Sequence, residues 1–175
     1  MRLFVAVYPP EHVAVTLQQA AMNLTLPPYR LVPVDQIHLT LAFIGDVDAR
    51  DLPRVEESVG RSTAGLVAFD LMAIRLMTLP HRGLSRLVAA EITAPSPLME
   101  IQRRLVMRLA RSPRAKAGDR FLPHVTLVRF KAEAKVEVDQ PVQSEAFTVA
   151  SVRLMRSTLL PTGAVHETMR EFAIG

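Results

Sequence analysis

His38-Leu39-Thr40-Leu41 and a second copy, His124-Val125-Thr126-Leu127, decide how the rest of this chain is interpreted. Each copy sits in an alternating apolar run, residues 37–44 and 122–130, with the residue types of a β-strand. Side chains two positions apart on a strand point the same way. The sequence therefore predicts two strands that each present an imidazole with a hydroxyl beside it.

A single histidine on a strand is more often a structural residue than a catalyst, because histidine is commonly part-buried and hydrogen-bonded. The repetition changes this weighing. The chain has only five histidines, and two chance copies of His-x-Thr-Leu would be a coincidence on the order of one in a thousand. We therefore interpret both copies as functional.

Length and composition predict one compact unit that spans residues 1–175. Hydrophobic residues make up 49% of the chain, but no apolar run has spanning length, so we expect no membrane segment. The chain has no cysteine, which excludes disulfides, thiolate-bound zinc and a cysteine nucleophile. This composition suits a reducing compartment, and we expect a cytoplasmic protein.

The charge balance favours an anionic partner. The net charge is +4 and the isoelectric point is near 10.1. Most of the 21 basic residues are arginine, the better bidentate ligand of phosphate. These arginines are scattered rather than clustered, so charge alone permits an RNA partner without requiring one.

Apolar periodicity predicts an α+β fold with antiparallel neighbours, because strands outnumber helices. Helices are expected after Pro9-Pro10, after a cap at Asp48 or Asp51, and from Pro95. The last helix carries an arginine side that we expect to be solvated: Arg103, Arg104, Arg108 and Arg111. Besides the two motif strands, β-segments are expected at residues 2–8, 66–79, 86–92, 147–157 and 167–174, with surface loops at 111–120 and 131–140.

Two histidines on separate strands could be zinc ligands, helpers of a nucleophile, or an acid/base pair. A zinc site needs a third ligand. The remaining histidines, His12, His81 and His166, are predicted to lie in a helix start, a turn and a loop, and no carboxylate accompanies either motif at ligand spacing. The chain also lacks a Gly-x-Ser-x-Gly turn for a nucleophile. An acid/base pair remains, and we expect neither a metal nor another cofactor.

These residues resemble the two-histidine phosphoesterases, which carry two His-x-Thr/Ser-x motifs. Within that superfamily the chain is most similar to the bacterial RNA 2',3'-cyclic phosphodiesterases, historically called 2'-5' RNA ligases. The resemblance covers nearly the whole chain. Beyond the two motifs it rests on Arg2-Leu3-Phe4-Val5-Ala6, Arg30, Phe43-Ile44-Gly45, Arg129, Leu154-Met155-Arg156-Ser157 and Pro161-Thr162-Gly163.

The resemblance implies a single two-lobed domain with pseudo-twofold symmetry, in which antiparallel sheets line a central cleft and helices pack outside. It implies that His38 donates a proton and His124 accepts one, while Thr40, Thr126 and Arg129 bind the substrate phosphate. The implied substrates are RNA with 2',3'-cyclic phosphate ends or cyclic nucleotides, opened to 2'-phosphomonoesters. We expect a monomer.

Two other functions stay open from the residues alone. The same pair of histidines could join RNA ends as a 2'-5' linkage, the reverse reaction, or the chain could bind RNA ends or nucleotides without turnover. The position of Arg129 is also open. It lies five residues after His124, so an ideal strand would direct it to the opposite face, and it joins the histidines only if the strand bends or ends.

Overall fold

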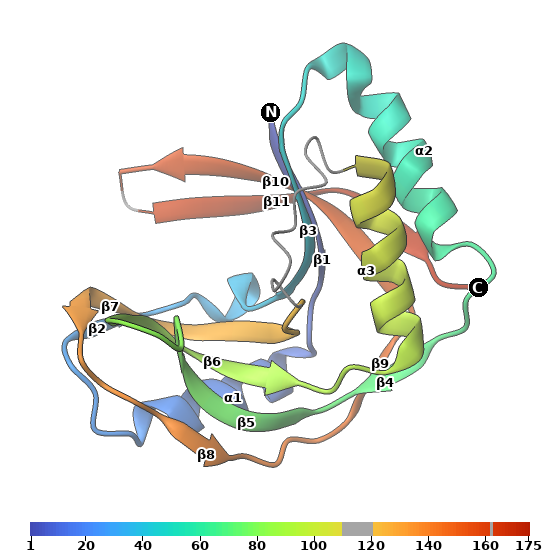
Figure 1. Cartoon of the computed structure of the whole chain (residues 1–175). Helices are drawn as coiled ribbons and strands as arrows, with labels where there is room; N and C mark the ends of the chain where they lie inside the picture. The colour runs from blue at the N-terminus through green and yellow to red at the C-terminus, as the bar shows by residue number, and fades with distance from the viewer. Residues whose placement is uncertain (110–120, 162) are drawn as a thin grey trace.

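The computed structural model of this chain describes residues 1–109, 121–161 and 163–175, which form a long antiparallel sheet with helices outside it (Figure 1). The expected α+β class is confirmed. The helices are α1 (Glu11–Met22), α2 (Leu52–Thr63) and α3 (Ser96–Leu109), with 3-10 turns η1 (Val34–Gln36) and η2 (Ala49–Asp51). The strands are β1 (Arg2–Val7), β2 (Tyr29–Leu31), β3 (Leu39–Asp46), β4 (Phe69–Leu71), β5 (Ala73–Leu79), β6 (Ser85–Ile92), β7 (His124–Ala134), β8 (Asp139–Pro141), β9 (Phe147–Val149), β10 (Ser151–Leu160) and β11 (Gly163–Ala173).

The main sheet has two halves that meet at the motif strands. Its order is β11-β10-β1-β3-β7-β6-β5-β8, with β2 paired to β7, and β4 pairs with β9 in a separate small sheet. Every described strand pair is antiparallel. The two halves join where Leu39 of β3 faces Val125 of β7. The two copies of the motif therefore lie where the two halves of the sheet meet.

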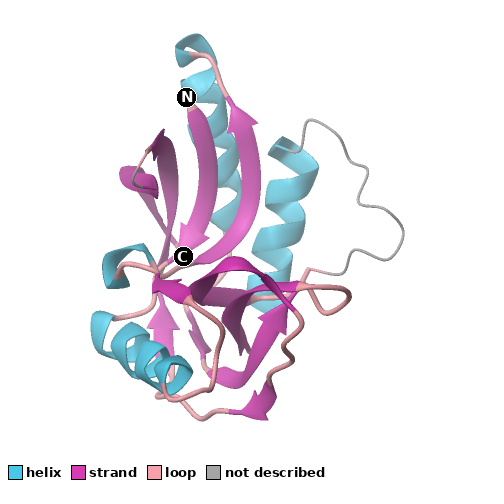
Figure 2. Ribbon diagram, turned by 90° about the vertical axis from the view of Figure 1, so that its left-hand side faces the viewer, coloured by secondary structure: helices cyan, strands magenta, loops and turns pink. Residues whose placement is uncertain are grey.

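Each half contains an antiparallel strand pair connected through a helix, β1–α1–β3 in one and β6–α3–β7 in the other. The helices cover the strands of the opposite half, because α1 packs against β7 and α3 packs against β3. They lie outside the sheet, α2 and α3 side by side at one end and α1 at the other (Figure 1, Figure 2). The two halves thus share one hydrophobic core.

Alternation along β1 divides the sheet into two faces. Leu3, Val5 and Val7 are buried in the core that the helices cover. Phe4 and Ala6 point to the other face, where they pack with Met155 and, in part, with Tyr8. We call this second surface the histidine face, because the motif histidines lie on it.

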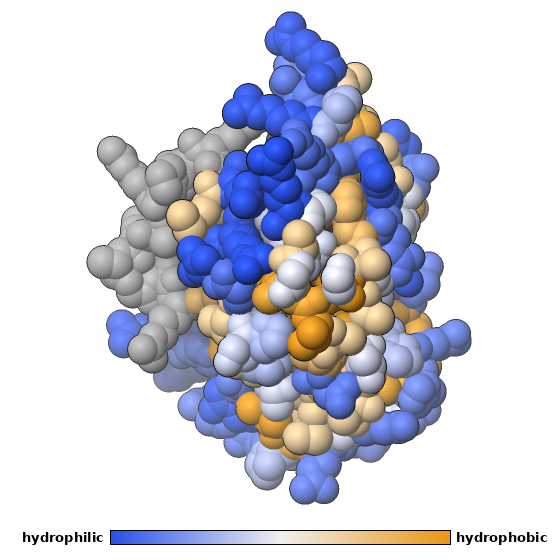
Figure 3. Space-filling model, turned by 90° about the vertical axis from the view of Figure 1, so that its right-hand side faces the viewer, coloured by the Kyte–Doolittle hydropathy of each residue, from blue (hydrophilic) through white to orange (hydrophobic). Residues whose placement is uncertain are grey.

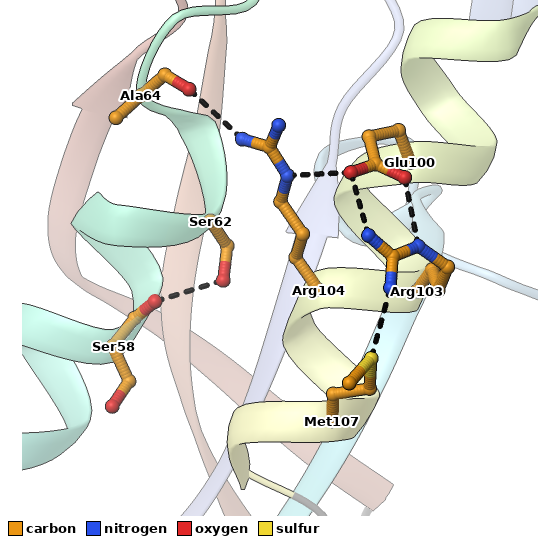
Figure 4. A network of polar contacts seen from close by, with 7 residues as sticks. All are labelled: Ser58, Ser62, Ala64, Glu100, Arg103, Arg104 and Met107. Atoms are coloured by element: carbon orange, nitrogen blue, oxygen red, sulfur yellow. Dashed lines mark hydrogen bonds and ion pairs between the residues drawn. The ribbon is translucent and has the colours of Figure 1, made fainter.

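Helices α2 and α3 present a polar outer surface, as expected for the arginine side of α3. In Figure 3 hydrophilic side chains cover the upper part of this side of the molecule, and apolar ones gather below them. Glu100 accepts hydrogen bonds from Arg103 and Arg104 at 2.8 and 2.7 Å, and these bonds lower its pKa to about 2 (Figure 4). Arg104 also donates to the carbonyl oxygen of Ala64, 2.9 Å away, just after α2. Arg104 therefore links α3 to the end of α2, while the bonds of Arg103 stay within α3.

Several predicted elements differ from the observed ones. Residues 131–140 were expected to be a surface loop, but β7 continues to Ala134 and β8 begins at Asp139, because β6 and β5 supply the pairing partners. The expected strand at residues 66–79 is interrupted at Met72, where β4 leaves to pair with β9. Neither Asp48 nor Asp51 makes a side-chain cap hydrogen bond. The predicted loop at residues 111–120, with Arg111, lies outside the described residues.

Candidate active site

The two motifs lie side by side on the histidine face. His124 is the first residue of β7, whereas His38 immediately precedes β3 rather than lying within it. The bridge between Leu39 and Val125 sets the register of the two strands. Continued by one residue in each direction, this register places His38 opposite Thr126 and His124 opposite Thr40. Each imidazole thus has a hydroxyl from the other strand beside it as well as one from its own.

Both imidazoles are anchored in the same way. The Nδ1 atom of His38 lies 2.7 Å from the carbonyl oxygen of Gln36, and Nδ1 of His124 lies 2.8 Å from the carbonyl oxygen of Leu122. A carbonyl oxygen only accepts, so Nδ1 carries the hydrogen in each case. The Nε2 atom of each neutral ring is then left without a hydrogen and is able to accept a proton. The two anchors, each two residues before its histidine, explain why the duplicated motif begins where the chain enters the strand.

His38 is enclosed by other rings. The ring centroids of Phe4, Tyr8 and His166 lie 5.1, 5.3 and 5.1 Å from that of His38. Burial lowers the pKa of His38 to about 4, and the nearby charges of His166, Arg129 and His124 act in the same direction, while the bond to Gln36 opposes them. In the substrate-free protein His38 is therefore neutral at pH 7.

The surroundings of His124 are different. Glu91 of β6 is its cross-strand neighbour, so the two side chains lie on the same face. The carboxylate of Glu91 accepts a hydrogen bond of 2.7 Å from Nε of Arg75, and Arg75 also pairs with Asp139 at 3.3 Å. The two motif histidines thus have the same kind of backbone anchor but different environments. His38 is packed among rings, and His124 lies beside a chain of ion pairs.

Arg129 reaches the histidine face because β7 is bulged. Thr126 pairs with Ala89 and Val128 pairs with Val88, so Leu127 is an extra residue on its strand. The bulge reverses the alternation after Thr126 and returns Arg129 to the side of the histidines. Its charge contributes to the lowered pKa values of His38 and His166. The bulge at Leu127 therefore places Arg129 on the same face of the sheet as the motif histidines.

His166 was expected in a loop, and that expectation was wrong. It lies within β11, opposite Ser157 of β10, and its ring stands edge-on to His38 at an interplanar angle of 78°. Tyr8 was also missed. Its ring packs on His38, the Arg153 guanidinium lies 5.2 Å from its centroid, and burial raises its pKa to about 12. Alternation along residues 163–173 was the signal that could have placed His166 on a strand.

Two surface hollows among the described residues lie away from the motif residues. A surface hollow of about 540 Å³ lies beside α3, and one of about 400 Å³ lies beside β5 and β8, and neither is lined by a motif residue. Within residues 1–109, 121–161 and 163–175, no three side chains of His, Cys, Asp or Glu are grouped to hold a metal ion. In the same residues no helix has the length and apolar character to cross a membrane. The constellation of polar side chains is what identifies the site.

Two relatives align with most of this chain. The RNA 2',3'-cyclic phosphodiesterase of Thermus thermophilus is 33% identical over 183 residues, covering 99% of this chain and 90% of the relative. The enzyme of the same name from Methanothermobacter thermautotrophicus is 28% identical over 153 residues, covering 83% of this chain and 82% of the relative.

Solved structures share the fold. TT0787 of Thermus thermophilus superposes with a TM-score of 0.82 at 28% identity, covering 99% of this chain and 98% of that one. The E. coli protein LigT, crystallised with phosphate, superposes with a TM-score of 0.78 at 25% identity, covering 99% and 96%. The family model described as the 2'-5' RNA ligase superfamily matches residues 9–159, a segment that holds both motifs. With its duplicated histidine strands inside that match, this chain belongs to the 2'-5' RNA ligase superfamily.

Proposed function

We propose that this protein is a phosphodiesterase that opens 2',3'-cyclic phosphates at RNA ends and leaves a 2'-phosphomonoester. The observation that carries the proposal is the pair of imidazoles on adjoining strands, each with Nδ1 anchored to a carbonyl oxygen. The names of the relatives from Thermus thermophilus and Methanothermobacter thermautotrophicus support the substrate class.

The proposed reaction is an in-line displacement at phosphorus. One imidazole takes a proton from water as the water oxygen bonds to phosphorus, and the other gives a proton to the ribose O3' as its bond to phosphorus breaks. Thr40 and Thr126 donate hydrogen bonds to the non-bridging oxygens, and Arg129 supplies positive charge as negative charge builds there. The catalytic step proposed here uses no metal or other cofactor.

The resemblance assigns proton donation to His38 and proton acceptance to His124. A donor must be protonated, but His38 is neutral at pH 7 in the free protein because its pKa is lowered to about 4. We infer that the bound substrate restores the protonated form of His38. A phosphate anion beside the ring favours the imidazolium form and offsets the charge of Arg129. His38 would then be charged mainly in the substrate complex.

We further propose that the whole chain works as a single two-lobed domain, as a monomer in the cytoplasm. The shared core supports the first point, because α1 and α3 each cover a strand of the opposite half. The cysteine-free composition supports the last, because it suits a reducing compartment. Gel filtration with light scattering would test the oligomeric state.

The deciding experiment incubates purified protein with 2',3'-cyclic AMP and with a short RNA that ends in a cyclic phosphate, with and without chelator. We expect turnover in both cases and a 2'-phosphate product, identified by phosphorus NMR. A 3'-phosphate would overturn the proposed orientation of the ribose. Binding without turnover would support a non-catalytic module instead, and joining of the RNA to a 5'-hydroxyl end would support the ligase.

A further inference from the structure

His166 lies against the proposed proton donor although it belongs to neither motif. Its ring centroid is 5.1 Å from that of His38 and 4.9 Å from that of Phe4, edge-on in both cases. The antiparallel partner of His166 is Ser157, and two residues further along β11 Thr168 contacts Met155 of the histidine face. The described site therefore contains three imidazoles rather than two.

The two ring nitrogens of His166 are in different environments. Among the described residues Nδ1 is buried and has no hydrogen-bond partner, while the side chain as a whole is partly exposed. A second proton would place a charged, unpaired N–H group at that buried position, which is costly. Burial first and the charge of Arg129 second lower the pKa of His166, and Asp35 opposes them. His166 is therefore neutral at neutral pH.

The buried nitrogen also selects between the two neutral forms of the ring. Hydrogen on Nδ1 would leave an unpaired buried donor, whereas hydrogen on Nε2 leaves only an unpaired acceptor there, and orphaned donors are the rarer of the two in proteins. The favoured form thus carries its hydrogen on Nε2. In this form Nε2–H is the hydrogen-bond donor of His166, and the ring carries no charge that would compete with His38 for the role of acid.

We propose that His166 is a third catalytic residue, which donates a hydrogen bond from Nε2–H to a phosphoryl oxygen of the substrate beside His38. This inference rests on the proposed phosphodiesterase activity. The bond strengthens as negative charge develops on the phosphoryl oxygens, so it acts mainly on turnover. No proton is transferred by His166. It remains the donor throughout the reaction.

Three variants separate this role from simple packing, with 2',3'-cyclic AMP as substrate. His166→Phe keeps a ring against His38 and Phe4 but removes the donor, and we expect kcat to fall about fivefold, the effect of one neutral hydrogen bond. His166→Gln keeps a donor, and we expect it to retain more of kcat than His166→Phe. His166→Ala removes both features and should be the slowest. His81→Phe, in the exposed turn between β5 and β6, is the matched control and should equal the parent protein.

Two outcomes would overturn the inference. Wild-type kcat in His166→Phe, with only His166→Ala impaired, would mean that the ring acts by packing. Nitrogen-15 NMR of the parent protein with inorganic phosphate should show hydrogen on Nε2 of His166 and a shift of that resonance on binding, and hydrogen on Nδ1 would contradict the proposal. Failure of the proposed function looks different, because the parent protein itself would then be inactive on every cyclic phosphate.

Discussion

Phe43 and Arg129 occupy corresponding positions in the two halves of the molecule. Each lies five residues after a motif histidine and follows a bulge at the leucine of its motif, Leu41 in β3 and Leu127 in β7. Phe43 is 73% exposed and lies near Phe4, with ring centroids 6.3 Å apart, whereas Arg129 brings a charge close to His38. The duplication repeats the backbone while the two sides of the site differ in chemistry.

Arg129→Ala should lower kcat/KM by about 10- to 100-fold, because it removes a charge-assisted hydrogen bond to the phosphate. Arg129→Lys should recover part of this loss, since the charge returns without the bidentate fork. The matched control is Arg86→Ala, an exposed arginine of β6 that pairs with Glu133. If both alanine variants behaved alike in steady-state assays, Arg129 would have no role at the phosphate.

His38→Ala and His124→Ala should each lower kcat by about 10²- to 10⁴-fold, the usual contribution of one general acid or base. The double variant should be little worse than the worse single variant, because the two groups act as a unit. Binding of inorganic phosphate, measured by calorimetry, should largely persist. Near-normal turnover in either single variant would contradict the mechanism.

Thr40→Val and Thr126→Val should each slow turnover about fivefold, less than the loss of the neighbouring histidine. Each substitution keeps the shape of the side chain and removes one neutral hydrogen bond of about 1 kcal/mol. Steady-state kinetics on a cyclic nucleotide checks this ranking. A threonine variant slower than its histidine partner would mean that the roles are misassigned.

The pH dependence should differ between the free protein and the complex. The profile of kcat/KM reports the free protein and should be bell-shaped, because the active form holds one proton on the pair of histidines. Its acid limb should lie near pH 4, where His38 titrates and the pair takes up a second proton. In kcat the bound phosphate should move that limb to higher pH. Arg129→Ala should raise the acid limb of kcat/KM, because the arginine charge helps to lower the pKa of His38. An acid limb of kcat/KM near pH 6.5, the ordinary value for histidine, would show that burial does not lower the pKa of His38.

Gln18→Leu should lower the free energy of unfolding by about 1–3 kcal/mol. The Gln18 side chain donates from α1 to the carbonyl oxygens of Val32 and Leu127, at 2.7 and 3.2 Å, and leucine leaves the carbonyl groups without this buried donor. Gln19→Leu on the exposed side of α1 is the control. Urea denaturation should show a lower midpoint at an unchanged slope for Gln18→Leu alone.

Local sequence patterns were sufficient to predict the helices and strands that bury one face. The alternation around both motifs and the spacing of Leu98, Ile101 and Leu105 in α3 predicted observed elements, because each pattern reports the packing of its own segment. The placement of His and Thr two residues apart in each motif, on one face, could be predicted for the same reason. The chemical roles of these residues remain predictions.

Features that depend on distant partners could not be predicted in this way. The contact between His166 and His38 joins residues from opposite ends of the chain, and it exists only because β11, β10, β1 and β3 are assembled in that order. The direction of Arg129 depends on a bulge, which is a property of pairing between strands. The end of β7 and the start of β8 were not predicted within residues 131–140, because these residues are charged and pairing with β6 and β5 needs no apolar pattern.

Each half of the molecule supplies a helix that covers a strand of the other half. All residues of the turn between β5 and β6, 80–84, are exposed, so a protease could cut the backbone there and separate β1–α1–β3 from β6–α3–β7. Each fragment would still carry the helix that covers a strand of the other. The nicked protein should therefore persist as a noncovalent complex. Produced separately, the two fragments should complement each other, and neither should fold alone.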